Sequence, residues 1–111
     1  MQRSDPERVR DMLTEIDDAL EFVEGFDVWS FLEDRRTRKA VAYSIQIMGE
    51  AAQGLTLQFK ADHPDVEWRK IIGMRHRIVH DYGAVSYRIV WSVVHEDLPD
   101  LRAVLEPLVE E

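Results

Sequence analysis

The sequence has no cysteine, few glycines and prolines, and no long apolar run, and each absence narrows the class of protein. Without cysteine in its 111 residues, the chain has no disulfide framework, no thiolate zinc site and no cysteine nucleophile. The five glycines and four prolines form no low-complexity tract and no interdomain linker. The length therefore predicts one domain over residues 1–111, large enough to bury a core without covalent crosslinks.

Basic residues are also outnumbered by acidic ones. Fourteen basic and 22 acidic residues give a net charge of −8, so the chain is not a general polycation for nucleic acids. Any contact with RNA must then be local. The densest cationic run is Arg35-Arg36-Thr37-Arg38-Lys39, which fits a solvated helix end and a contact surface for an RNA backbone equally well.

Segments suited to secretion or to a bilayer are missing as well. Residues 1–12 contain no apolar core of a signal peptide. The longest charge-poor stretch, Ala40–Phe59, contains Glu50 together with glutamine, serine, threonine and glycine residues, which a bilayer core disfavours. We therefore expect a cytoplasmic protein with no membrane partner.

Helical spacing runs through nearly the whole chain. The segment Ser4-Asp5-Pro6-Glu7 is typical of a capping box, and apolar residues then recur at steps of three and four until Gly25. These apolar residues are Val9, Met12, Leu13, Ile16, Leu20 and Val23. Asp27 is expected to cap a short aromatic turn, and the next helix is expected from about residue 34 to about residue 59.

Further helices are expected downstream. A third helix is predicted over Glu67–His80 and closed by Asp81-Tyr82-Gly83, a fourth begins near Ser86, and Pro99 forces a kink or restart before a final short helix. The helix over residues 34–59 has a wider apolar surface than one neighbour needs, which places it at the bundle centre or at a subunit interface. The pattern predicts an all-α, up-down bundle of four to five helices.

The third predicted helix departs from a simple amphipathic pattern. On a wheel of about 100° per residue, Arg75 falls between two groups of apolar residues. These are Trp68, Ile72 and Val79 on one flank and Ile71 and Ile78 on the other. Arg75 is therefore expected in the middle of the apolar face, with Lys70 and Arg77 on the opposite side. His76 and His80 lie one turn apart on an edge beside Arg75.

Structural roles compete with functional ones at these positions. Arg75 could join two helices through an ion pair with a carboxylate such as Glu50, because a guanidinium in apolar surroundings needs a partner. Two histidines one turn apart could hold a metal, but a third ligand is not evident, so no metal is expected. Trp29, Trp68 and Trp91 are expected as core anchors rather than as platforms for bases.

The segment Arg75-His76-Arg77-Ile78-Val79-His80-Asp81-Tyr82 resembles the signature of HEPN-type ribonucleases. In that signature an arginine, a polar residue and three further positions precede a histidine. The flanking segments Trp68–Met74 and Val90-Trp91, and Gly49-Glu50-Ala51-Ala52 before them, are similar to the HepT-like toxin branch. The resemblance spans nearly the whole chain. HepT-like members more often have asparagine where this chain has His76, and histidine is among the polar residues found there across the superfamily.

The resemblance implies a HEPN-like homodimer that brings two Arg–His motifs to a shared cleft and cleaves RNA without a metal or cofactor. It implies that Arg75 and His80 are catalytic. It further implies a prokaryotic toxin whose partner is a minimal nucleotidyltransferase antitoxin. In this branch the antitoxin adds AMP to a tyrosine two positions after the motif histidine, and Tyr82 matches that position. The ordinary alternative for Tyr82 is packing at a helix end.

The side chains suit this chemistry. An imidazole such as that of His80 exchanges protons near neutral pH, and the guanidinium of Arg75 can hold phosphate oxygens as a two-pronged donor. His76 can exchange a proton or orient the phosphate. The expected RNA contacts are Arg35, Arg36, Arg38, Lys39 and Arg77. The alternative function is a non-catalytic helical module that binds a nucleotide or a protein partner.

Overall fold

Helices form nearly all the regular structure of the computed structural model, which describes residues 3–79 and 84–109. In chain order they are α1 (Asp5–Phe22), α2 (Val28–Glu33), α3 (Arg35–Gln53), α4 (Leu57–Asp62), α5 (Trp68–Ile78), α6 (Tyr87–Ser92), the π-helical turn η2 (Val93–Asp97), α7 (Leu98–Leu105) and the 3₁₀ turn η3 (Glu106–Leu108). Within the described ranges, the one β-type pairing is an isolated antiparallel bridge between Val79 and Val85. The all-α class predicted from the sequence is confirmed.

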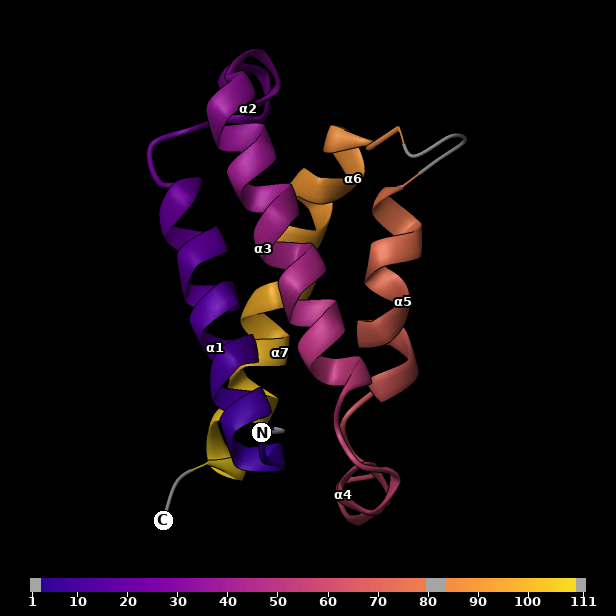
Figure 1. Cartoon of the computed structure of the whole chain (residues 1–111). Helices are drawn as coiled ribbons and strands as arrows, with labels where there is room; N and C mark the ends of the chain where they lie inside the picture. The colour runs from indigo at the N-terminus through magenta and orange to yellow at the C-terminus, as the bar shows by residue number, and fades with distance from the viewer. Residues whose placement is uncertain (1–2, 80–83, 110–111) are drawn as a thin grey trace.

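The long helical segments run alternately up and down (Figure 1). α3 lies at the centre, with α1 packed along one side, α5 along another, and the arm formed by α6, η2 and α7 behind. α2 and α4 are six-residue helices at opposite ends of the bundle. The central position of α3 explains the wide apolar surface of its sequence, because neighbours cover it from several sides.

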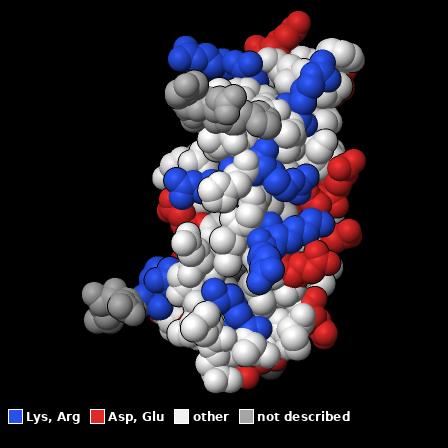
Figure 2. Space-filling model, turned by 90° about the vertical axis from the view of Figure 1, so that its right-hand side faces the viewer, with Lys and Arg blue, Asp and Glu red and all other residues white. Residues whose placement is uncertain are grey.

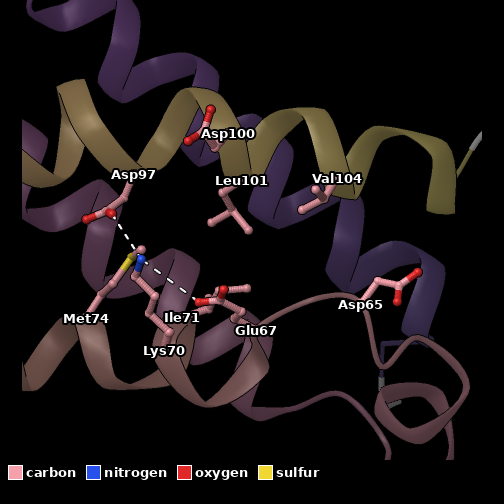
Figure 3. Close-up of a pocket in the computed structure, with 9 residues that line it drawn as sticks. All are labelled: Asp65, Glu67, Lys70, Ile71, Met74, Asp97, Asp100, Leu101 and Val104. Carbon is pink, nitrogen blue, oxygen red and sulfur yellow. Dashed lines mark ion pairs between the residues drawn. The ribbon is translucent and has the colours of Figure 1, made fainter.

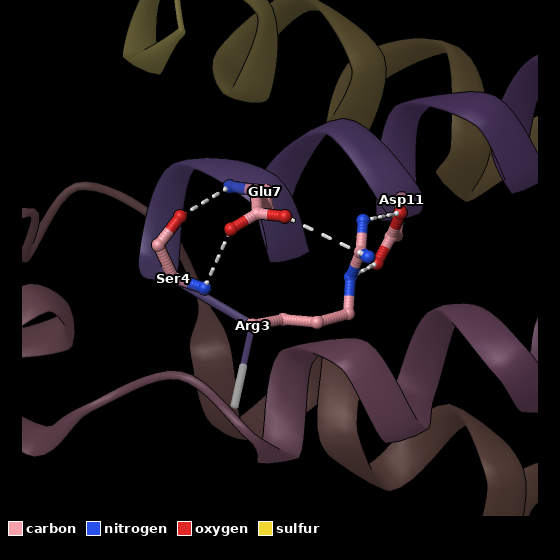
Figure 4. Close-up of polar contacts among 4 residues, drawn as sticks. All are labelled: Arg3, Ser4, Glu7 and Asp11. Carbon is pink, nitrogen blue, oxygen red and sulfur yellow. Dashed lines mark hydrogen bonds and ion pairs between the residues drawn. The ribbon is translucent and has the colours of Figure 1, made fainter. Parts of the chain in front are cut away.

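The first helix begins as its sequence predicts. The Ser4 hydroxyl accepts a hydrogen bond from the backbone N–H of Glu7 at 3.2 Å, and the Glu7 carboxylate accepts one from the backbone N–H of Ser4 at 3.1 Å (Figure 4). Arg3 adds a two-pronged contact with the Asp11 carboxylate, at 2.6 and 2.8 Å. These contacts cap the N-terminal end of α1 and satisfy its first backbone N–H groups.

A single helix is predicted over residues 34–59, and its predicted C-terminal end is wrong. α3 ends at Gln53, and α4 begins afresh with Thr56 as its N-cap. The Thr56 backbone N–H and hydroxyl both donate to the Asp5 carboxylate, at 2.9 and 2.7 Å, while the Thr56 hydroxyl accepts from the N–H of Phe59 at 3.1 Å. The break is therefore held by a contact with the start of α1, which the apolar spacing of the segment does not reveal.

The C-terminal arm stays helical through its proline. Ser86 caps α6, as expected, and Pro99 occupies the first turn of α7. Because proline has no N–H to donate to the carbonyl four residues earlier, the regular helix cannot pass through Pro99 unchanged. The π-helical turn η2 precedes it and absorbs the change. The predicted restart is confirmed in this form.

The core lies where α1, α3, α5 and the C-terminal arm meet. Its largest fully buried side chains are Phe31, Met12, Ile16, Ile45, Met48, Met74, Ile78, Leu98 and Leu105. On the predicted apolar face of α1, Leu13 and Leu20 are only partly buried, whereas Ala19 is fully buried. Across residues 3–79 and 84–109, no helix combines the length and apolar character needed to cross a bilayer.

Candidate active site

α5 is anchored in the bundle by one face. Its buried residues are Trp68, Ile71, Met74 and Ile78, spaced by three and four positions. The Trp68 indole N–H donates to the backbone carbonyl of His63 at 3.0 Å, which fixes the start of the helix. The last turn carries Arg75, His76 and Arg77. The packing of α5 thus determines where these three side chains emerge.

The expectation that Arg75 lies in the middle of the buried face is wrong. Arg75 is exposed, and the buried face is centred between Ile71 and Ile78 and extends to Met74 on the side away from Arg75. On the other flank Trp68 is buried, whereas Ile72 and Val79 are only partly buried. Arg75 therefore borders the packed face and has a solvent-accessible guanidinium.

No ion pair with Glu50 holds Arg75 in the bundle, and no other described residue forms one with it. His76 is also exposed, on the same turn as Arg75. His80 and Tyr82 lie outside the described residues. The described part of the site is thus a guanidinium and an imidazole, both accessible at the C-terminal end of α5.

The backbone is paired on either side of residues 80–84. Val79 and Val85 form an antiparallel bridge, and the backbone N–H of Ser86 donates to the carbonyl of Ile78 at 2.6 Å. This backbone clamp joins the end of α5 to the start of α6. Val79 and Val85 therefore lie together at the end of α5 that carries Arg75.

Arg77 is engaged in a different way from Arg75. Its guanidinium contacts the Asp97 carboxylate of η2 at 2.9 Å, and Lys70 reaches the same carboxylate at 3.4 Å. Lys70 also lies 4.0 Å from Glu67 (Figure 3). The Asp97 side chain is only 13% exposed, against 42% for Arg77. The structure therefore places Arg77, an expected RNA contact, in an ion pair that ties α5 to the C-terminal arm.

The cationic run at the start of α3 is divided between surface and interior. Its exposed cations are Arg35, Arg36 and Lys39. Arg38 is partly buried: it donates to the Leu32 carbonyl at 3.0 Å, and its guanidinium lies 4.8 Å from the ring centre of Tyr87. The buried Nε of Arg38 has no hydrogen-bond partner among the described residues. Arg38 is thus placed to join α3 to α6, and the other three cations are accessible.

Basic side chains gather on the side of the molecule that carries α5. Figure 2 shows Lys and Arg distributed along the length of this face, with most of the visible Asp and Glu along one edge. The chain as a whole has a net charge of −8. The local concentration of cations predicted from the sequence is therefore visible on this face, and it can attract phosphate despite the overall acidity.

The three tryptophans divide in a way that the sequence does not indicate. Trp68 is buried, and Trp91 is partly buried with its ring 5.1 Å from that of Phe31. Trp29 is 63% exposed, so its prediction as a core anchor is wrong. The reason is that α2 has a single buried position, taken by Phe31, and a residue two positions earlier emerges on roughly the opposite side of a helix.

A small cavity lies between α5 and the C-terminal arm, away from Arg75. Its volume is about 180 Å³. It is lined by Asp65, Glu67, Lys70, Ile71, Met74, Asp97, Asp100, Leu101 and Val104 (Figure 3). No local pattern in the sequence predicts this cavity, because Lys70 and Asp97 meet only after α5 packs on the arm. Within the described ranges, no group of three or more His, Asp or Glu side chains is placed to hold a metal ion.

The shifted carboxyl pKa values belong to the scaffold. Backbone N–H groups lower the pKa of Asp27 and of Asp34, because each carboxylate accepts a hydrogen bond at the start of its helix, at 2.8 and 2.9 Å. The pKa of Glu7 is lowered for the same reason, through Ser4. Glu15 differs: partial burial between α1 and α3 raises its pKa.

An all-α bundle with an exposed arginine and histidine on the last turn of one helix, and with a basic face around them, has the features of a HEPN-type RNA-cleaving protein. The family model described as "Ribonuclease HepT-like" matches residues 12–108. The chain therefore belongs to the HepT-like ribonuclease family, and its class of activity is that of a ribonuclease.

Relatives with similar names cover most of the chain. A protein of Thermococcus cleftensis named "Probable ribonuclease HepT" is 36% identical over 103 residues, which cover 89% of this chain and 94% of the relative. A "Putative RNase" of Caldanaerobacter subterraneus subsp. tengcongensis is 31% identical, covering 90% of this chain and 89% of the relative. A "Putative RNase" of Methanocaldococcus jannaschii is 30% identical, covering 86% and 88%. No solved structure matches the chain.

Proposed function

We propose that this chain is the metal-independent endoribonuclease toxin of a prokaryotic toxin–antitoxin pair, with Arg75 and His80 as its catalytic residues. The observation that carries the proposal is the accessible guanidinium of Arg75 on the last turn of α5, beside exposed His76 and five positions before His80. In a chain of the HepT-like ribonuclease family, this motif is the part of the molecule suited to RNA chemistry.

The reaction needs no group beyond RNA and the chain. The 2′-hydroxyl of a ribose loses its proton and attacks the adjacent phosphorus, the bond to the 5′-oxygen breaks, and that oxygen takes up a proton. His80 exchanges one of these protons, since an imidazole titrates near neutral pH. Arg75 stabilises the extra negative charge of the phosphorane through paired N–H donors. The products are a 2′,3′-cyclic phosphate and a free 5′-hydroxyl.

One Arg–His pair leaves one of the two proton transfers without a dedicated group, unless His76 supplies it. A second copy of the chain provides another pair. The accessible edge of α5 around Arg75, with partly buried Ile72 beside it, is a surface on which a second copy would enclose the substrate. We therefore propose a homodimer with a shared cleft, which sedimentation equilibrium would detect as twice the chain mass of 13.0 kDa. A monomer that is fully active would contradict it.

Regulation is proposed from the sequence motif. A minimal nucleotidyltransferase antitoxin transfers AMP from ATP to the Tyr82 hydroxyl, which forms a phosphodiester and releases pyrophosphate. The added negative charge and bulk, two residues from His80, would repel the RNA backbone. Coexpression with a neighbouring nucleotidyltransferase should add one or more AMP masses to the peptide that contains Tyr82. An unmodified Tyr82 in an inactive complex would favour simple steric inhibition instead.

The cleavage test uses total cellular RNA and three proteins: wild type, Arg75→Ala and His80→Ala. Wild type should cleave in EDTA and leave 2′,3′-cyclic phosphate ends, and both variants should lose cleavage and growth arrest while keeping wild-type circular dichroism. Full activity of His80→Ala, or loss of cleavage in EDTA, would contradict the proposal.

The second candidate is a non-catalytic helical module for a nucleotide or protein partner. It is favoured by the acidic chain and by the exposed apolar side chains of residues such as Tyr43 and Leu57. It predicts that any cleavage in a purified sample follows contamination and is the same for all three proteins. Binding of a nucleotide or partner would then persist in Arg75→Ala.

A further inference from the structure

Trp29 is a large aromatic side chain held at the surface next to a cation. It lies on α2 and is 63% exposed, and the guanidinium of Arg88 on α6 lies 5.2 Å from the centre of its ring. An indole normally contributes a large buried area to a core, so leaving most of it in water forgoes that stabilisation. The pair combines an aromatic face and a positive charge, the two groups by which proteins bind single-stranded nucleic acids without base specificity.

Contacts that do not use the open part of the Trp29 ring hold α2 in place. Asp27 and Ser30 cap the helix reciprocally, with hydrogen bonds of 2.8 and 3.0 Å. Phe31 is fully buried and packs on Trp91 of α6. The indole is therefore carried by a fixed helix, and a ligand that stacks on it has little conformational entropy to overcome on the protein side.

The pair lies at the end of the bundle that carries the motif. α2, the start of α6 and the end of α5 share this end (Figure 1). Arg88 is three residues beyond Val85, the partner of Val79 in the backbone clamp. The exposed cations of the α3 start, Arg35, Arg36 and Lys39, follow α2 directly. An RNA strand leaving the motif thus has an aromatic face and several cations within the same region.

We infer that Trp29 and Arg88 form a nucleotide subsite for single-stranded RNA, with a base stacked on the indole and a neighbouring phosphate paired with the guanidinium. The subsite rests on the proposed ribonuclease function and extends it, because it binds the strand away from the bond that is cut. It is a binding site and takes no part in proton transfer. Any of the four bases can stack there, since each has an aromatic face.

The test measures binding with an RNA that cannot be cleaved. The probe is a fluorescein-labelled oligouridylate twelve nucleotides long with every 2′-hydroxyl methylated, so the attacking group is absent. Trp29→Ala should weaken its binding by about 5- to 150-fold, the range for loss of one stacked base. Trp29→Phe should recover much of the affinity. Arg88→Ala should weaken binding and reduce its salt dependence.

A matched control is available on the outer face of α3. Tyr43 is 64% exposed, nearly the same as Trp29, and no cation is placed over its ring in the described structure. Tyr43→Ala should change the affinity by less than about twofold. Equal losses in Trp29→Ala and Tyr43→Ala would show a general effect of surface aromatics and overturn the subsite.

Two further outcomes would overturn the subsite of Trp29 and Arg88. If Trp29→Ala binds the probe as wild type does, the subsite is absent. If Trp29→Ala instead converts a dimer to a monomer in sedimentation equilibrium, Trp29 is a contact between two copies and not an RNA site. Failure of the proposed function has a different signature: Arg75→Ala would keep full RNA cleavage whatever Trp29→Ala does to binding.

Discussion

Arg75 and Arg77 offer an internal comparison, because they lie two positions apart on the same turn and differ in what holds them. Arg77 contacts Asp97 at 2.9 Å, whereas Arg75 has no ion-pair partner among the described residues. If Arg75 acts on the phosphorane, its replacement by alanine should affect the reaction and spare the fold. Replacement of Arg77 by alanine should lower the stability of the fold and largely spare the reaction.

The expected magnitudes follow from these contacts. Loss of Arg77 breaks one ion pair of a carboxylate that Lys70 still contacts at 3.4 Å, so Arg77→Ala should lower the free energy of unfolding by about 1 kcal/mol or less. Arg75→Ala should change it by less than about 0.5 kcal/mol, as for an exposed side chain without a partner. For cleavage, removing a donor to the transition-state charge should cost Arg75→Ala about 100- to 1,000-fold in rate. Arg77→Ala should lose less than about tenfold.

The assay combines urea unfolding with single-turnover cleavage of a labelled single-stranded RNA. Arg75→Lys serves as a third variant, since it keeps the charge but loses the planar pair of donors, and its rate should fall between wild type and Arg75→Ala. Equal loss of cleavage in Arg75→Ala and Arg77→Ala would refute the distinction drawn from the Asp97 contact. Full cleavage by Arg75→Ala would refute the catalytic role itself.

Three scaffold predictions can be checked by chemical denaturation. Burial raises the pKa of Glu15 above its ordinary 4.5, so the protonated carboxyl stabilises the fold at low pH and this contribution is lost as pH rises through the raised pKa. Glu15→Gln should therefore be at least as stable as wild type at pH 7, and its stability should depend less on pH above 4.5. A large destabilisation by Glu15→Gln would contradict this. Met74→Ala should cost about 2 to 5 kcal/mol, because the side chain is buried, and a cost below 1 kcal/mol would show that the site collapses. Thr56→Val should cost about 1 to 2 kcal/mol by removing the cap of α4 and the hydroxyl contact with Asp5, while wild-type stability would mean that the break in the helix is fixed by other contacts.

The parts of the fold that the sequence predicts well depend on neighbours in the chain. The capping box of Ser4 and Glu7, the cap at Asp27 and the start of α6 at Ser86 each involve residues three positions apart. Period and composition capture such contacts. The apolar spacing does not predict the end of α3, because that end depends on Asp5, 51 residues before Thr56, while the apolar stripe runs on without interruption.

The site residues stay a prediction from the sequence, and the structure corrects the expected placement of Arg75. A helical wheel counts the apolar neighbours of Arg75 but cannot say which of them other elements cover: Ile71, Ile78 and Trp68 are buried, whereas Ile72 and Val79 are only partly buried. The same limit applies to Trp29, whose burial depends on whether α2 lies inside the bundle or at its end. The ion pairs of Asp97 form between elements far apart in the sequence, so no local pattern predicts them.

The backbone clamp between Val79 and Val85 has a consequence for how this protein can be re-engineered. The bridge holds Val79 and Val85 together, so the positions between them connect two points that the scaffold already fixes. Lengthening a connection between two fixed points adds little closure entropy, because that cost grows only with the logarithm of its length. Residues inserted between the paired valines, with His80 and Tyr82 kept, should therefore leave the helices beneath unchanged.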